Sequence, residues 1–423
     1  GWGAVRGVYG LKYSDVVSVF YGVVAEAVEY AVYEERVVVS VADGVAVYVA
    51  PRLYRWFSGE LALAFASRRG CYAPYVHYGF EYPPLVGALW YASTCLAYTL
   101  VLPEEYTLEV LVERATALAV VHYLVHAAVL TASLALSAVV MVKLADELRI
   151  PRRRVLLYLL LPSTVLYAVY NWDALALLPA LTSIYLHARR RHFASGVLLG
   201  VATSAKLLPA FIGAVILAKL TGEVARGEAR WRDALRFLTG CVLGGVPLLA
   251  WVVLYPQGFT WAVNHIGGWF CENCIYNLVL LNEYSPLHRV LFLIFAPTAL
   301  LASCYLAYRG RAGLATSSSL AMLSATVLNY IFTPQMLIAV TPLLLLALPS
   351  HQLLLVAVAD VANALLIIVF FNREWVELLG HREPISPFAP SSAVQLLANT
   401  RNVLLLITMI ILYTQVSKVS KRD

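Results

Sequence analysis

Apolar stretches recur from Ala115 to the end of the chain, and every second connection between them is basic. Such stretches are typical of helices that cross a membrane. Apolar residues make up 61% of the chain and charged residues 13%, whereas a soluble domain has about 25% charged residues. The sequence therefore predicts an all-α polytopic membrane protein with eleven apolar spans: 115–144, 155–170, 174–187, 193–204, 207–219, 237–255, 290–308, 312–329, 336–348, 352–371 and 403–413.

The basic connections predict how these spans are oriented. Lys and Arg are enriched in the short cytoplasmic loops of membrane proteins. The cytoplasmic side should therefore hold 152–154, 189–191, 226–236, 309–311 and the basic tail from Lys418. The alternate connections should then be extracytoplasmic: 171–173, 205–206, 256–289, 333–335 and 372–402.

By the same alternation, residues 1–114 should form a first extracytoplasmic loop region and 115–423 one integrated transmembrane domain. Leu85–Leu102 is apolar enough to cross a membrane, but a full span there would invert every later connection. We therefore expect a re-entrant or interfacial helix. Arg36–Ala50 has two β-branched runs around Asp43-Gly44, which predicts a β-hairpin in the first loop. The alternative is a first membrane helix that ends near Trp56.

The apolar stretches between Val155 and Lys219 are short, at about 12–16 residues each, where a full span needs about 20. Their turns hold Asn171-Trp172-Asp173 and Lys206. We expect these turns to lie below the outer surface in a cavity, where polar residues at membrane depth are tolerated. The alternatives are helix capping for Asn171 and Asp173 and snorkelling to the interface for Lys206.

The segment Tyr75–Leu85 combines aromatic residues with one carboxylate and two prolines. Pro83 and Pro84 fix the backbone and prevent a helix from running through this point. The segment is therefore predicted to be a rigid, aromatic-lined loop that suits a sugar. Within it, Tyr78, Glu81 and Tyr82 are the candidate contacts.

A second extracytoplasmic segment, 265–276, mixes His265 and Glu272 with several aromatic residues. An interfacial aromatic belt is the alternative to a binding role. Cys271 and Cys274 face an oxidising compartment in this topology and could pair with each other or with Cys71. No second cysteine pair completes a zinc site, so no metal site is expected.

Mid-span polar residues are the last candidates. Asp360 and Asn363 lie one helical turn apart within an apolar stretch. A carboxylate at membrane depth is by default a functional candidate, and an interhelical hydrogen bond is the alternative.

Five short motifs occur in one order along nearly the whole chain: 12–17 around Asp15, Glu81-Tyr82-Pro83-Pro84-Leu85, Asn171-Trp172-Asp173, 204–209 around Lys206, and Phe332-Thr333-Pro334-Gln335. Together they resemble the membrane glycosyltransferases of the GT-C fold. They are most similar to the polyprenyl-phosphate-mannose-dependent mannosyltransferases, which include the GT87-type enzymes and the first mannosyltransferase of GPI assembly.

The resemblance implies an inverting transfer of a sugar, mannose in the first place, from a polyprenyl or dolichyl phosphate to an acceptor hydroxyl. Most members of that family require no metal, and no cofactor is expected for this chain. A carboxylate on the first outer loop acts as general base, and a cation stabilises the leaving phosphate. Asp15 fits the base by its Tyr13-Ser14-Asp15 setting, which would place a membrane helix before Gly1; Glu60 is the rival.

The resemblance also implies where the substrates bind: Tyr78, Glu81, Tyr82, Asn171, Asp173, Lys206, His265, Glu272 and Gln335. The expected partners are a lipid-linked sugar donor, a glycan or glycolipid acceptor and membrane lipids, with no nucleic acid. The expected location is the plasma membrane of a prokaryote, with an archaeon favoured and the catalytic face outside. The alternative function is a polytopic transporter or a flippase of lipid-linked oligosaccharides. Against it, the chain has no internal repeat, and its polar candidates lie on one predicted side.

Overall fold

The computed structural model describes residues 16, 73–76, 79–101 and 108–419. The two candidate bases Asp15 and Glu60, the predicted hairpin 36–50, Cys71 and Tyr78 lie outside the described residues. The chain divides into two compact units, which are described separately. Among the described residues, the first unit comprises those up to Leu130 together with Pro247–Gly267, and the second comprises Thr131–Val246 and those from Gly268 onward. The expected division of the chain at residue 115 stays a prediction.

The first unit contains α4 (Pro84–Val101), the beginning of α5 (Leu108–Glu147), most of α12 (Val246–Leu254), and α13 (Pro256–Gly267). The helix α4 begins at Pro84, because proline lacks the N–H that a first-turn residue does not need. Its buried face joins α5 through Ser93, whose hydroxyl lies 3.0 Å from Nδ1 of His122. The Trp90 ring packs edge-on against the His122 ring at 4.5 Å, so α4 and α5 form one layer.

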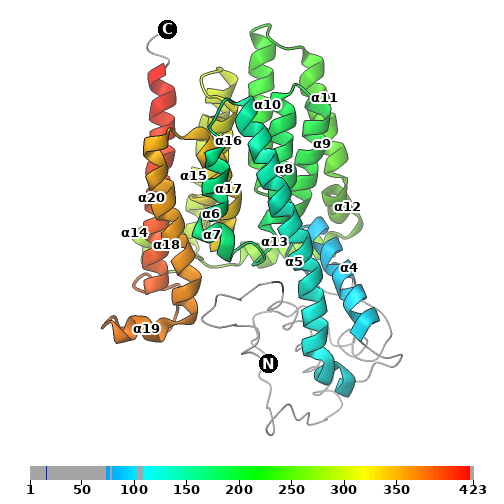
Figure 1. Ribbon diagram of the computed structural model, residues 1–423, viewed down its shortest axis with the longest axis vertical. Coiled ribbons are helices and arrows are strands. Elements are labelled where there is room, and N and C mark those ends of the chain that lie inside the picture. Colours follow the sequence, from blue (N-terminus) through cyan, green and yellow to red (C-terminus); the bar gives the residue numbers. More distant parts are fainter. Residues whose placement is uncertain (1–15, 17–72, 77–78, 102–107, 420–423) are drawn as a thin grey trace. The chain divides into compact units, whose positions relative to one another are not determined.

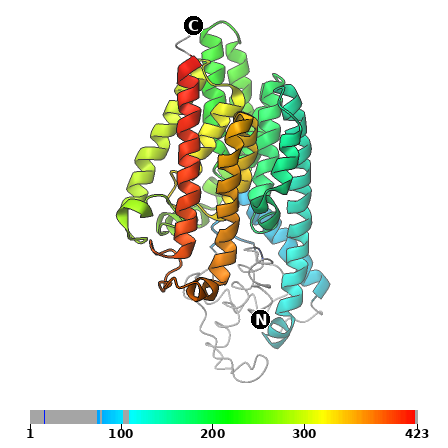
Figure 2. The same cartoon turned by 60° about the vertical axis from the view of Figure 1, so that its left-hand side comes forward.

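The second unit is a bundle of helices that run side by side (Figures 1 and 2). The most extensive contacts join α9 to α11, α8 to α9, α18 to α20, and α10 to α15. Its elements are α6 (Arg153–Leu160), α7 (Pro162–Leu166), α8 (Asp173–Ala188), α9 (His192–Ala205), α10 (Pro209–Ala225), α11 (Trp231–Gly244), α14 (Asn277–Leu280), α15 (Leu287–Tyr308), α16 (Leu314–Thr326), η2 (Pro334–Met336), α17 (Leu337–Ala347), η3 (Ser350–Gln352), α18 (Leu353–Phe371), α19 (Arg373–Leu378) and α20 (Ala393–Val419).

Glycines explain the closest packing in this bundle. Gly196 and Gly200 on α9 face Gly240 and Gly244 on α11, and both pairs have the four-residue spacing of membrane helix interfaces. A Cβ at Gly196 would collide with the carbonyl oxygen of Phe237, and one at Gly244 would collide with a carbonyl oxygen of α9. The two backbones therefore touch directly, as small residues permit.

Helix length confirms a multi-pass membrane protein. Among the described residues, five helices are long and apolar enough to cross a membrane, and a sixth counts if α11 and α12, bent by 53°, form one span. The five are 84–101, 117–147, 287–308, 350–371 and 393–417. The other predicted spans correspond to helices of at most 17 residues, shorter than a full crossing requires. The helix α4 meets the length criterion, and its re-entrant placement stays a prediction.

Contacts within the second unit gather the predicted basic connections at one end. Arg189 pairs with Glu147 at 3.0 Å, and Arg190 pairs with Glu223 at 2.6 Å. Arg154 donates to the carbonyls of Leu345 and Leu348, both at 2.6 Å. The α10–α11 connection and the final turns of α20 lie at this end in both views (Figures 1 and 2). We call it the basic end, and the end that holds the alternate connections the polar end.

Candidate functional site

The polar end contains a cluster formed where two short helices begin and end. Asp173 is the first residue of α8, where a carboxylate interacts favourably with the helix dipole. Lys206 follows the last residue of α9 in an extended conformation, before Pro209 starts α10. Asn171 lies in the turn before α8 and is 3% exposed. The short helices thus place these three polar residues inside the bundle.

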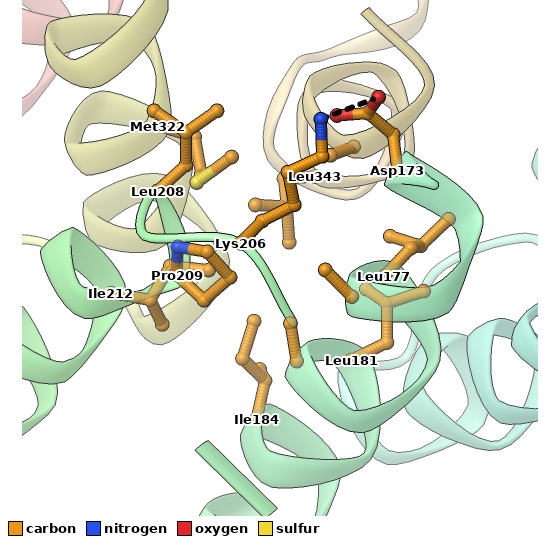
Figure 3. A pocket seen from close by; sticks show the side chains of 13 residues that line it. Asp173, Leu177, Leu181, Ile184, Lys206, Leu208, Pro209, Ile212, Met322 and Leu343 are labelled. Carbon is orange, nitrogen blue, oxygen red and sulfur yellow. Dashed lines mark ion pairs between the residues drawn. The ribbon is translucent and has the colours of Figure 1, made fainter. Parts of the chain in front are cut away.

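The Lys206 ammonium is the centre of this cluster. Its Nζ lies 3.4 Å from Oδ2 of Asp173 and 3.2 Å from Oδ1 of Asn171. The Lys206 side chain is 13% exposed and that of Asp173 2%. Figure 3 shows the ammonium directed at the carboxylate, which favours an ion pair over snorkelling. Oδ1 of Asn171 also accepts the backbone N–H of Trp172 at 2.6 Å, so Asn171 makes a local hydrogen bond just before α8 as well as its contact with Lys206.

The cavity beside this ion pair is narrow and mostly apolar. Its volume of about 10 Å³ is about the room that one water molecule needs. Asp173 and Lys206 line it together with apolar side chains of α8, α10, α16 and α17, such as Leu177, Ile212, Met322 and Leu343 (Figure 3). Asn171 does not line this cavity, and the expected larger cavity around both turns stays a prediction.

The first unit brings together two other predicted residues, Glu81 and His265. Glu81 precedes the prolines that start α4, and His265 lies in the last turn of α13. Oε2 of Glu81 and Nε2 of His265 are 2.8 Å apart, and the side chains are 16% and 15% exposed. The Trp261 ring stacks on the His265 ring at 4.9 Å and 6°. A carboxylate, an imidazole and an indole face are therefore held next to one another.

The loop before α4 is shaped to accept that indole. A Cβ at Gly79 would collide with the Trp261 ring, so this close approach requires glycine. Tyr82 packs on the buried ring of Phe80 at 5.5 Å, and the Tyr75 hydroxyl donates to the Tyr82 carbonyl. These contacts join Tyr75, Phe80 and Tyr82 of the predicted aromatic loop, and the rigidity of the loop stays a prediction.

Glu272 and Gln335 occupy other places at the polar end. Glu272 accepts a 2.7 Å hydrogen bond from Nε1 of Trp269. Its backbone pairs with the chain around Ile331 in an isolated parallel bridge, with bonds to Tyr330 and Phe332. Gln335 lies in η2 and is 5% exposed. Neither contributes to the cavity beside Lys206.

Asp360 and Asn363 serve helix contacts. The Asp360 carboxylate accepts the backbone N–H of Ser163 at 2.9 Å, which satisfies a donor that the first turn of α7 leaves open. The Asn363 amide donates to the Ser163 hydroxyl and to the Pro334 carbonyl, both at 2.9 Å. These bonds support the interhelical alternative for both residues.

Sequence reasoning missed Arg401, which organises the polar end. It is fully buried in α20 and donates to Oδ1 of Asn363 at 2.7 Å and to the carbonyls of Phe332 at 2.8 Å and Asn273 at 3.2 Å. Its guanidinium carbon also lies 3.7 Å from the centre of the Phe332 ring. These acceptors belong to three segments far apart in the chain. The sequence feature that could have identified this residue is its position, two residues before the last predicted apolar stretch.

No protein-family model matches the chain, and no curated protein matches it either.

Proposed function

We propose that the chain is an inverting glycosyltransferase of GT-C type that takes its sugar, mannose in the first place, from a polyprenyl or dolichyl phosphate. The observation that carries the proposal is the Lys206 ammonium, held by Asp173 and Asn171 against an otherwise apolar wall. A lipid-linked phosphate combines an anion with an apolar chain, and this pairing of a cation with an apolar lining suits both parts.

The chemistry explains why a cation belongs there. The donor is a phosphate diester with one negative charge, and its leaving group is a phosphate monoester that gains charge as the bond to the sugar breaks. A fixed ammonium stabilises the transition state more than the bound donor, which is what raises a rate. Asp173 neutralises Lys206 while the site is empty, so a buried lone charge is avoided. Because the cavity holds about one water molecule, donor binding requires the helices around it to move apart.

We assign Glu81 and His265 to the binding of sugar hydroxyl groups. A carboxylate accepts hydrogen bonds from sugar hydroxyls, and an adjacent imidazole donates or accepts according to its tautomer. The Trp261 face beside them suits the apolar face of a sugar ring. The general base proposed is Asp15, with Glu60 as its rival.

The test is a transfer assay with the purified chain and a radiolabelled mannosyl polyprenyl phosphate, scored by release of polyprenyl phosphate in the presence of membrane glycolipid extract. Asp15→Asn should lower turnover about 10²–10⁴-fold, the usual effect of losing a general base. Glu60→Gln is the matched control and should retain turnover. The opposite pattern would identify Glu60 as the base. If the wild type releases no polyprenyl phosphate, the proposal is contradicted.

The transporter alternative is separated by the same donor. A flippase reconstituted in vesicles would move the labelled lipid between leaflets and leave the sugar attached. Movement without release in the wild type would establish that alternative.

A further inference from the structure

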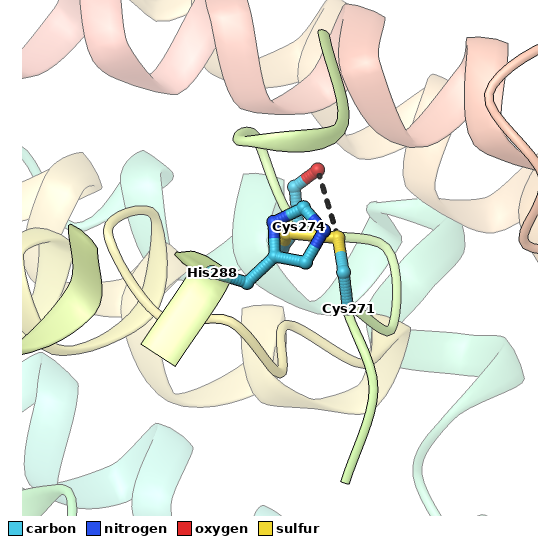
Figure 4. Close-up of side chains that lie close together, drawn as sticks. All are labelled: Cys271, Cys274 and His288. Carbon is cyan, nitrogen blue, oxygen red and sulfur yellow. Dashed lines mark hydrogen bonds between the residues drawn. A yellow bond between two sulfur atoms is a disulfide. The ribbon is translucent and has the colours of Figure 1, made fainter. Parts of the chain in front are cut away.

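A cysteine pair and a histidine form a buried cluster at the polar end. Cys271 and Cys274 are joined in a disulfide, which answers the open question of their pairing. Nδ1 of His288, in the first turn of α15, lies 3.8 Å from Sγ of Cys274. All three residues are buried, and their ligand atoms lie within 4.8 Å of one another (Figure 4).

The His288 ring has a defined tautomer. Its Nε2 lies 2.6 Å from the carbonyl oxygen of Asn282. A carbonyl can only accept, so Nε2 carries the proton, and in the neutral ring Nδ1 presents its lone pair. That lone pair faces the Cys274 sulfur (Figure 4). A backbone carbonyl that fixes the far nitrogen is the usual support of a histidine that binds a metal.

The turn that carries the cysteines is held independently of the disulfide. The Cys271 N–H donates to the Glu283 carbonyl at 2.8 Å. The Cys274 carbonyl accepts from Gln395 at 3.2 Å, and the Asn273 carbonyl accepts from Asn402 at 2.8 Å and from Arg401. Breaking the sulfur–sulfur bond therefore leaves both cysteines in place beside His288.

We propose that reduction of the Cys271–Cys274 disulfide creates a site for a zinc-class divalent cation, with Cys271, Cys274 and His288 as ligands. Two thiolates and one imidazole are the donors that zinc prefers. Three protein ligands leave a fourth tetrahedral position open to water. The expectation of no metal site rested on the lack of a second cysteine pair, and the fold supplies His288 instead. This proposal is independent of the transferase function.

The steps balance in atoms and electrons. A dithiol reductant supplies two electrons and two protons, the bond between Cys271 and Cys274 breaks, each sulfur gains one proton, and the reductant becomes a disulfide. The cation then displaces the two thiol protons into solvent. His288 binds through Nδ1 and releases none, because its proton stays on Nε2. The same turn is thus held by a sulfur–sulfur bond under oxidising conditions and by a metal under reducing ones.

The test uses the full chain in detergent, reduced with a phosphine and freed of excess reductant without air. Co²⁺ is the probe, because thiolate ligands give it a charge-transfer band. We expect about one Co²⁺ per reduced chain, displaced by Zn²⁺, and no band in the oxidised chain. Cys274→Ser should abolish the band. His288→Gln should weaken Zn²⁺ binding by roughly 10-fold or more, by analogy with the loss of residues that support a metal site.

Two controls keep the test specific. Cys95 is also disulfide-bonded, and Cys241 and Cys304 are free thiols, so Cys95→Ser and a Cys241→Ser/Cys304→Ser double variant should keep the band. X-ray absorption of the Zn²⁺-loaded wild type should show two sulfur ligands and one imidazole, without depending on whether a variant folds. A band that survives Cys274→Ser, unchanged affinity in His288→Gln, or zinc without a nitrogen ligand would overturn the proposal.

Discussion

The two ends of the second unit differ in how much of their charge lies at the surface. At the basic end, Arg189 and Glu147 form a surface ion pair with side chains 55% and 31% exposed, although Arg154 and Glu223 there are buried. At the polar end, Arg401 is fully buried and Asp173 is 2% exposed. Exposed pairs contribute little to stability, whereas buried charges require defined partners.

This difference separates charges that orient the protein in the membrane from charges that are held in defined positions. The surface charges of the basic end need only their sign, which sets orientation under the positive-inside rule. The polar end fixes the position of each charge through Asp173, Asn363 and backbone carbonyls. A buried charge is costly to keep, and the proposed phosphate site at Lys206 lies at the polar end.

The largest expected effect concerns accessibility. Ile385 at the polar end is fully exposed, and a Cβ at Gly313 at the basic end would meet no atom within 4 Å, so cysteine fits at both. In intact cells of a Cys241→Ser/Cys304→Ser background, an impermeant maleimide should label Ile385→Cys and not Gly313→Cys. Both should react after lysis. Labelling of Gly313→Cys alone would mean that the chain has the opposite orientation in the membrane.

The next effect concerns Arg401. Arg401→Met removes the donor to four buried oxygens, those of Asn363, Phe332, Asn273 and Asn402, and an unpaired buried acceptor costs about 1–3 kcal/mol. We expect a loss of about 3 kcal/mol or more in the free energy of unfolding in detergent. Arg152→Met at the basic end, where Arg152 pairs with Asp146 at the surface, is the matched control and should be close to wild type. Equal losses in both variants would abolish the distinction between the ends.

A smaller effect should appear as coupling between Lys206 and Asp173. A double-mutant cycle with Lys206→Met and Asp173→Asn should give an interaction energy of about 1–3 kcal/mol. The pair Arg189 and Glu147, treated in the same way, should give no coupling above error. Absence of coupling at Lys206 would mean that its charge is solvated in the working protein.

The smallest effect is a pH dependence at the basic end. The hydrogen bond from Arg226 lowers the pKa of Glu228 below its usual value near 4.5. A lowered carboxyl pKa gives stability that is present above the unfolded pKa and is lost as pH falls through the folded one. The difference in melting temperature between wild type and Glu228→Gln should therefore be small near neutral pH and shrink as pH falls below the usual carboxyl pKa near 4.5. A difference that grows on acidification would have the wrong sign.

The sequence predicted what depends on local pattern. The alternation of apolar stretches and arginines was sufficient to predict that the basic connections gather at one end. The short stretches around Asn171 and Lys206 predicted a buried polar cluster. Pairings between distant segments could not be predicted, because spacing along the chain does not show which loops meet. Glu81 and His265 were each identified without their mutual contact. His288 was missed because it follows Cys274 by 14 residues on another element.

The central claim is that Lys206 at the polar end holds the donor phosphate. The direct measurement is the Kd of polyprenyl phosphate for the purified chain, compared between Lys206→Ala and the basic-end control Lys219→Ala, whose lysine pairs with Glu223. A charge-assisted hydrogen bond contributes about 1.5–3 kcal/mol, so Lys206→Ala should weaken binding roughly 10- to 100-fold. Lys206→Arg should restore part of it, and Lys219→Ala should bind like wild type. Unchanged Kd in Lys206→Ala, in protein that elutes as wild type on size exclusion, would contradict the claim.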